Sequence, residues 1–113
     1  MENELIGRLF DFSVNVIKYC RTLKKSKEND VIIHQLIKSA TSSSANYEES
    51  QAASSKADFK NKVNIALKEM RESNFWLRIL SAVGNNSEEL KFLISESNEL
   101  KNILGKICKK LSK

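Results

Sequence analysis

The sequence predicts an all-α protein that folds as an antiparallel up-down-up-down four-helix bundle. Four segments of the chain place apolar residues three or four positions apart, which is the spacing of one helical face. The 113 residues include no proline and only three glycines, so little interrupts these segments. Four amphipathic helices joined by short polar turns bury their apolar faces most simply as such a bundle, whereas a sheet would need alternating segments that the sequence lacks.

The length of the chain fits one domain, residues 1–113. We expect its helices over about residues 3–24, 30–53, 56–83 and 88–111. The first helix carries an apolar stripe formed by Leu5, Ile6, Leu9, Phe10, Ser13, Val16, Ile17 and Cys20. The polar segment KKSKEND follows, in which Ser26, Asn29 or Asp30 can cap the second helix.

The second helix contains a serine-rich segment, SATSSSANYEES at residues 39–50, that resembles a linker when taken alone. Serine is disfavoured in helices by about 0.5 kcal/mol against alanine. The helical spacing of apolar residues nevertheless continues from Leu36 through the serines to Tyr47, so we interpret the segment as a packed helix. Small side chains let two helices approach closely. We expect a tight contact seam formed by Ala40, Ser43, Ser44 and Ala45.

Turn signals bound the third and fourth helices. Residues 55–58 read SKAD, which has the form of a capping box with Asp58 in place of the commoner glutamate. Gly84 tolerates positive φ and therefore suits the end of the third helix. Ser87 suits the N-cap of the fourth helix, with two glutamates in the positive first turn after it.

The short turn between the second and third helices sets their register. It predicts that Glu49 lies near Lys60 and that Lys38 lies near Glu72, which makes both pairs candidate ion pairs. These pairs give the register a direct check, because each joins one residue of the second helix to one residue of the third.

The third helix is apolar beyond a single stripe, because Phe75, Trp76 and Ile79 widen its apolar arc. A broad core face explains this arc. A subunit interface also explains it, since interfaces are enriched in aromatic residues. The sequence leaves both interpretations open, and Phe75, Trp76 and Ile79 are the candidate interface residues.

Catalytic and cofactor-binding motifs are missing from the sequence. With a single histidine, His34, the chain can build neither the Glu-x-x-His pairs of a di-iron bundle nor a Ser-His-Asp triad. The glycines are too far apart for a phosphate-binding loop, and the two cysteines form no metal-binding pair. We therefore expect no enzymatic activity, no cofactor, no metal and no disulfide between Cys20 and Cys108, which lie near the ends of antiparallel helices.

No segment approaches the run of about 20 apolar residues that spans a membrane. The N-terminal sequence MENELIGRLFDF has acidic residues where a signal peptide has basic ones, so we expect a cytoplasmic protein without membrane attachment.

The chain is basic, with 19 Lys and Arg against 14 Asp and Glu, a net charge of +5 and a pI near 9.3. This balance is compatible with a nucleic-acid partner. Two clusters are candidate phosphate contacts: Lys18, Arg21, Lys24, Lys25 and Lys27 at the end of the first helix, and Lys106, Lys109, Lys110 and Lys113 at the end of the fourth. The helix dipole alone also explains cations at these ends, so both interpretations stay open.

The segment at residues 35–80, QLIKSATSSSANYEESQAASSKADFKNKVNIALKEMRESNFWLRIL, resembles a family of bacterial four-helix bundles. This is the family named for proteins encoded in intervening sequences of 23S ribosomal RNA genes, which is similar to the accessory variability determinant of diversity-generating retroelements. The matching residues are Ser39, Ala40, Ser42, Asn46, Glu49, Ser55, Asp58, Phe59, Ala66 and Glu72. The chain departs from the pattern at Ser44 and Ser50, where relatives often carry proline, alanine or glycine.

The resemblance implies a homopentamer with a basic surface able to bind nucleic acid and without catalytic activity. For the retroelement relatives it implies a partnership with a reverse transcriptase and its RNA. We therefore expect a non-enzymatic, oligomeric accessory protein that binds RNA or DNA. The alternative is a structural scaffold that binds a protein partner and no nucleic acid, and salt dependence distinguishes the two because only phosphate contacts weaken steeply with salt.

Overall fold

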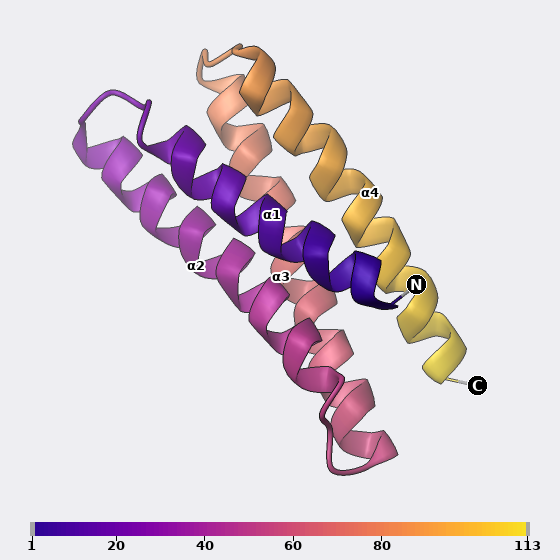
Figure 1. Cartoon of the computed structure of the whole chain (residues 1–113). Coiled ribbons are helices and arrows are strands. Elements are labelled where there is room, and N and C mark those ends of the chain that lie inside the picture. Colours follow the sequence, from indigo (N-terminus) through magenta and orange to yellow (C-terminus); the bar gives the residue numbers. More distant parts are fainter. Residues whose placement is uncertain (1, 113) are drawn as a thin grey trace.

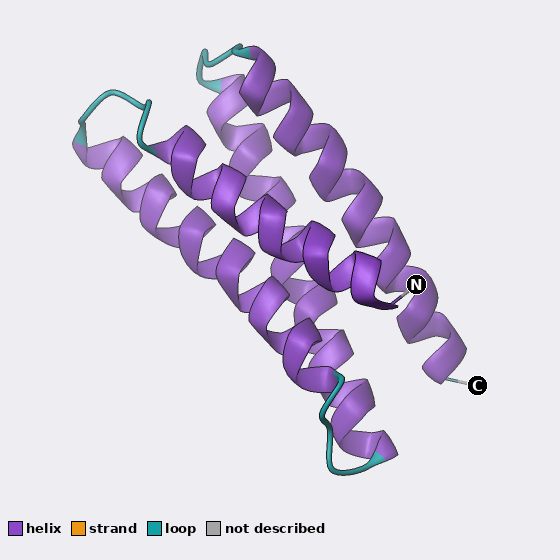
Figure 2. Cartoon of the chain, viewed as in Figure 1, coloured by secondary structure: helices purple, strands orange, loops and turns teal. Residues whose placement is uncertain are grey.

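Four helices form an antiparallel bundle in the computed structural model, which describes residues 2–112 (Figure 1). They are α1 (Glu2–Cys20), α2 (Lys27–Ser50), α3 (Lys56–Ala82) and α4 (Glu88–Leu111). Each helix reverses the direction of the one before it, and within the described residues the elements between them are turns and loops (Figure 2). The bundle measures 44 × 21 × 21 Å. The prediction of an all-α four-helix bundle is confirmed.

Serine side chains begin α2, α3 and α4. The hydroxyl of Ser26 accepts a hydrogen bond from the backbone N–H of Asn29 at 3.0 Å, and Ser87 accepts one from Leu90 at 3.2 Å. Ser55 accepts from the N–H of Asp58 at 3.0 Å. The Asp58 carboxylate accepts a hydrogen bond from the N–H of Ser54 rather than from that of the N-cap residue Ser55. Each cap satisfies a backbone donor that the first turn of a helix leaves free.

The helix ends differ from the predicted bounds at α1 and α2. Helix α1 ends at Cys20 rather than near residue 24, because the N–H groups of Thr22 and Leu23 bond to carbonyls three residues back and tighten the chain into a turn. Helix α2 begins at Lys27 because Ser26 is the cap, and it ends at Ser50 for the same reason as α1. Gly84 ends α3 with φ of +120°, as predicted, and the N–H of Asn85 bonds to Leu80 O.

The buried face of α1 is rotated from the predicted stripe. Phe12 and Tyr19 are buried in the core, whereas Phe10 is 57% exposed. The buried residues follow alternating steps of four and three, which is how a helix packs between two neighbours in a bundle. They are Leu5, Leu9, Phe12, Val16 and Tyr19. The predicted position of Phe10 in the core is therefore wrong.

The serine-rich segment is a packed helix, as predicted. Ser39, Ala40 and Ser43 are fully buried. The Ser43 hydroxyl donates to Ala66 O in α3 at 2.7 Å, and the Ser13 hydroxyl of α1 donates to Ala40 O at 2.9 Å.

A side-chain hydroxyl reaches a neighbouring backbone only where two helices lie very close, so these small residues set the spacing of α2 from α1 and α3. The predicted contact seam is correct for Ala40 and Ser43 and wrong for the other two residues, because Ser44 is only half-buried and Ala45 is exposed.

The register of α2 and α3 agrees with the prediction, while its expected ion pairs differ. Ser43 lies level with Ala66. Glu49 pairs with Lys62 at 3.5 Å rather than with Lys60, because Lys62, two residues further along α3, lies on the side of the helix that faces α2. Among the described residues Glu72 forms no ion pair with Lys38 and instead accepts from Trp76 Nε1 at 3.3 Å.

Arg8 connects α1 to α4. Its Nε and one terminal nitrogen donate to the two carboxylate oxygens of Glu96 at 3.1 and 2.7 Å, and the terminal nitrogen lies 3.3 Å from a carboxylate oxygen of Glu99. The hydrogen bonds with Glu96 raise the pKa of Arg8 above its ordinary value. This bidentate pair joins the first and last helices of the bundle.

The two cysteines are free and buried, and they lie in the last turns of helices that run in opposite directions (Figure 1). Burial raises the pKa of Cys20 to about 11. None of the described helices has the length and apolar content to cross a membrane.

Candidate nucleic-acid interface

The two predicted basic clusters lie at opposite ends of the bundle (Figure 1). Lys18, Arg21, Lys24, Lys25 and Lys27 surround the turn between α1 and α2. Lys106, Lys109 and Lys110 lie in the last turns of α4, and Lys113 lies outside the described residues. All of these described side chains are exposed.

Residues of the first cluster share their surroundings with acidic or polar groups. Lys18 lines a hollow between α1 and α4 together with Glu88 and Glu89. Lys24 lines a hollow at the α3–α4 turn, and its backbone carbonyl accepts a hydrogen bond from the Asn29 amide at 2.7 Å. The field at Lys18 is therefore partly cancelled, and Lys24 helps to fix the turn.

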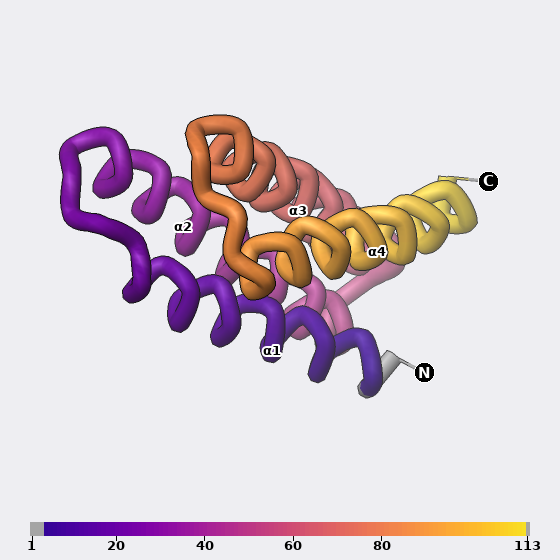
Figure 3. The backbone as a smooth tube through the Cα atoms, turned by 90° about the horizontal axis from the view of Figure 1, so that it is seen from above, coloured from indigo at the N-terminus to yellow at the C-terminus, as the bar shows by residue number. Residues whose placement is uncertain are grey.

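A basic groove lies between α3 and α4, which run side by side (Figure 3). We call it the α3–α4 groove, and its volume is about 650 Å³. Its lining residues are Arg71, Asn74 and Arg78 from α3 and Lys101, Asn102, Gly105, Lys106 and Lys109 from α4. Five of these described residues are cationic and none is acidic, which makes the groove a site of focused positive potential.

The groove contains three cations that the sequence analysis missed: Arg71, Arg78 and Lys101. Arg71 and Arg78 are seven residues apart and so share one face of α3. That spacing is readable in the sequence, but it indicates a site only once the register of α3 against α4 is known.

A buried amide holds Arg78 in place. The Asn74 side chain, which is only 3% exposed, donates to Ser97 Oγ at 2.9 Å and to Asn98 Oδ1 at 3.1 Å in α4. Its carbonyl oxygen accepts from Arg78 Nε at 2.9 Å. The Arg78 guanidinium also lies 5.9 Å from the centre of the Phe75 ring. The Nε donor is thus occupied by a fixed partner, and the donors on the two terminal nitrogens suit an oxyanion.

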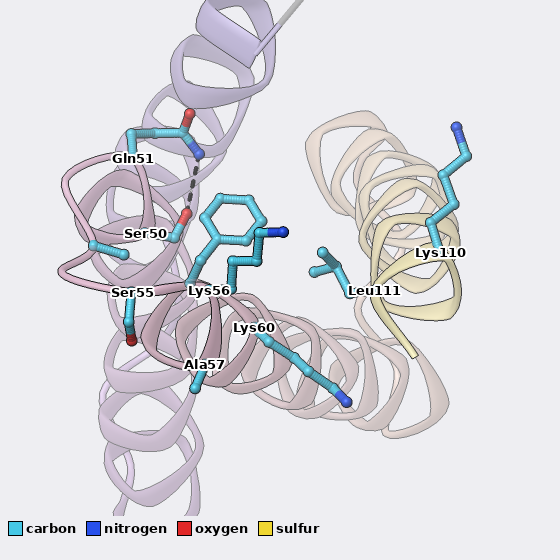
Figure 4. A pocket seen from close by; sticks show the side chains of 10 residues that line it. Ser50, Gln51, Ser55, Lys56, Ala57, Lys60, Lys110 and Leu111 are labelled. Atoms are coloured by element: carbon cyan, nitrogen blue, oxygen red, sulfur yellow. Dashed lines mark hydrogen bonds between the residues drawn. The ribbon is translucent and has the colours of Figure 1, made fainter. Parts of the chain in front are cut away.

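Lys110 lies in a second basic hollow, at the end of the bundle where α2 turns into α3 (Figure 4). Lys56 and Lys60 of α3 line the same hollow, and no described residue in its lining is acidic. Figure 4 shows Lys60 and Lys110 on different helices, with Leu111 pointing from α4 toward α3. Positive side chains therefore follow the C-terminal half of α4 from Lys101 to its end.

The candidate interface residues have different surroundings. Trp76 and Ile79 are half-buried and pack against the core, as a broad core face requires. Phe75 remains 43% exposed, with its ring 5.0 Å from that of Trp76 in an edge-to-face arrangement. Phe75 is therefore the residue of the three that most needs a partner to become buried.

Comparison with known proteins supports the resemblance found in the sequence. A family model described as 23S rRNA-intervening sequence protein matches residues 1–106. A crystal structure of a protein with unknown function from the S23 ribosomal protein family of Bacteroides thetaiotaomicron VPI-5482 is similar to this chain, with 32% sequence identity and a TM-score of 0.86. The similarity covers 96% of this chain and 97% of that one. No curated protein matches.

Proposed function

Because the chain belongs to the 23S rRNA-intervening sequence protein family, we propose that it is a non-enzymatic accessory protein that binds RNA or DNA through the α3–α4 groove. The observation that carries this proposal is the lining of the groove, with five cations and no acidic residue. The net charge of +5 is modest for a chain of this size. A groove that gathers cations from two helices nevertheless produces a local potential much larger than the net charge suggests.

The dimensions of the groove predict how binding depends on salt. Lys101 and Lys109 are eight residues apart on α4, a distance of about 12 Å along the helix. If the five cations neutralise about four phosphates of a single strand, log affinity falls with log salt with a slope near −3. Contacts of this kind carry no sequence information, so we expect similar affinity for strands of different sequence.

Two double charge reversals test the proposal. Lys106→Glu with Lys109→Glu changes the groove, and Lys24→Glu with Lys25→Glu makes the same change of net charge at the other end of the bundle. We expect the groove variant to lose affinity and to flatten the salt slope by about 1 to 2, while the matched control keeps the wild-type slope. Mobility-shift titrations at about 50 and 200 mM salt measure both quantities. Equal losses in the two variants would mean that net charge, not the groove, holds the polyanion.

The proposal includes assembly into a homo-oligomer, a pentamer by the family resemblance, in which several basic grooves act on one strand through effective concentration. Phe75→Asp tests it, because Phe75 is exposed whereas the neighbouring Trp76 and Ile79 pack against the core. Phe92→Asp is the control, since Phe92 is 56% exposed on α4. We expect the Phe75 variant to have a lower mass by light scattering and weaker binding, and the control to keep both. A monomeric wild type would contradict this part of the proposal.

The second candidate function is a scaffold for a protein partner. It is favoured by exposed aromatic residues, among them Phe10, which lines an apolar hollow between α1 and α2 together with Glu48 and Glu49. Binding at such a surface should change little with salt, in contrast to the groove. Partnership with a reverse transcriptase, and any relation to the retroelement proteins, rest on the resemblance alone and stay predictions.

A further inference from the structure

Gly105 lies in the interior of α4, at a position where the fold does not require glycine. Glycine lowers helix stability relative to alanine, so a helical glycine usually serves a positive φ or a close contact. Within the described residues Gly84 is the glycine with positive φ. A Cβ added at Gly105 would meet no atom of the protein within 4 Å outside its own helix backbone. Neither backbone conformation nor internal packing therefore requires glycine at this position.

The open space beside Gly105 belongs to the α3–α4 groove. Gly105 lies on α4 between Lys101 and Lys109, and Arg71 lines the same groove from α3. Because Gly105 has no side chain, the backbone of α4 is open to the groove between the cations of α3 and those of α4. A ligand can therefore approach this backbone more closely than any other residue type would permit.

Arg78 adds a fixed donor to the same groove. Its Nε is bonded to Asn74, and Asn74 is held by two residues of α4, so the guanidinium is positioned before any ligand arrives. A pre-positioned arginine loses less freedom on binding an oxyanion than a solvated lysine does. The groove thus combines an open floor with an oriented donor, which a surface of scattered lysines does not.

We propose, resting on the proposed function, that the α3–α4 groove binds the sugar-phosphate backbone of one nucleic-acid strand in direct contact with α4 at Gly105. A duplex is a stiff rod that does not bend over the length of this groove, whereas a flexible single strand can follow a concave, positively charged surface. A duplex would therefore rest on the cations at the rim, and only a single strand reaches the floor. The ligand class is a single-stranded polynucleotide, and RNA and DNA share the chemistry that is recognised.

Two glycines give a matched test. Gly105→Ala and Gly105→Leu fill the floor of the groove in steps without changing charge. Gly7→Ala and Gly7→Leu make the same changes in the interior of α1. An added Cβ at Gly7 also meets nothing within 4 Å, and Gly7 does not line the α3–α4 groove. Alanine and leucine are better helix formers than glycine, so all four variants should raise the melting temperature. A loss of binding in the Gly105 variants then cannot come from unfolding.

The probes are a fluorescein-labelled RNA strand of about 12 nucleotides, the DNA strand of the same sequence, and a DNA duplex of that length. By fluorescence anisotropy we expect Gly105→Leu to weaken single-strand binding by about tenfold or more, Gly105→Ala to weaken it less, and duplex binding to change by less than about twofold. The Gly7 variants should bind all probes within about twofold of wild type.

The outcomes separate this inference from the proposed function. If wild type binds the strands and Gly105→Leu binds them equally well, the strand does not reach the floor, and the inference is wrong while the proposed function stands. Equal losses in the Gly7 and Gly105 series would also overturn the inference, as would equal losses for strand and duplex. If wild type binds no probe, and the charge reversals in the groove change nothing, the proposed function itself fails.

Discussion

Replacement of Ser43 by valine should destabilise the bundle more than its small change in size suggests. Ser43 is fully buried and its hydroxyl donates to Ala66 O at 2.7 Å, so α2 and α3 have no free space between them at this point. Valine removes that hydrogen bond, which contributes about 1 kcal/mol. It also adds a methyl group to a tightly packed seam, at a cost of about 1 to 3 kcal/mol.

The sum is a loss of about 2 to 4 kcal/mol in the free energy of unfolding, a large part of the total stability of a domain of this size. Ala45→Val is the matched control, because Ala45 is exposed on the same helix and valine there costs only its helix propensity, about 0.5 kcal/mol. Ser43→Ala removes the hydrogen bond without adding bulk and should fall between the two, with a loss of about 1 kcal/mol.

Urea denaturation followed by circular dichroism measures all three variants. The midpoint should fall in the order Ala45→Val, Ser43→Ala and Ser43→Val, with an unchanged slope if the transition stays two-state. A Ser43→Val variant as stable as Ala45→Val would refute the idea that serine sets the spacing of α2 and α3. The serine-rich segment would then owe its place in the core to something other than size.

Three further perturbations follow from the fold. Burial raises the pKa of Cys20 from 9.0 to about 11, so the folded state holds this proton more tightly than the unfolded state does. The contribution of this group to the free energy of unfolding is complete below about pH 9 and falls by about 2 to 3 kcal/mol as the pH rises through 11. Cys20→Ala should lack that part of the loss in denaturation curves measured across this range. Gly84→Ala forces a side chain into φ of +120° and should lower stability by about 1 to 2 kcal/mol, which would contradict the cap geometry if absent. Arg8→Met breaks a pair that is only partly buried, so we expect a loss of about 1 kcal/mol that shrinks at high salt and is smaller in the background of Glu96→Gln, where only the contact of Arg8 with Glu99 remains.

Local signals explain why so much of the fold was readable from the sequence. The caps at Ser55 and Ser87 and the helix end at Gly84 depend on a few neighbouring residues, and all three agree with the prediction. The rotation of α1 does not depend on its own residues alone. Phe10 and Phe12 are equally apolar, and only the positions of α2 and α4 decide which of them is buried.

The groove was only partly predictable for the same reason. Lys106 and Lys109 stood out because they end a helix, where clustered charges are easy to see in the sequence. Arg71, Arg78 and Lys101 look like ordinary solvated helix residues until α3 and α4 are placed together. Asn74 gave no signal at all, since its burial depends on two polar partners in α4.

Asn74 also has a consequence for how α3 and α4 can move. Leucine-lined helices have similar contacts after sliding by a repeat, so apolar packing alone distinguishes poorly between such positions. The Asn74 amide reaches Ser97 and Asn98 in only one alignment of α3 and α4. If one helix slid along the other by one turn, about 5.4 Å, the amide would be buried without hydrogen-bond partners. The same slide would release Arg78 and separate the cations on the two helices. The buried Asn74 amide therefore fixes the alignment of α3 and α4 and, with it, the arrangement of the cations through which we propose that the groove binds a polyanion.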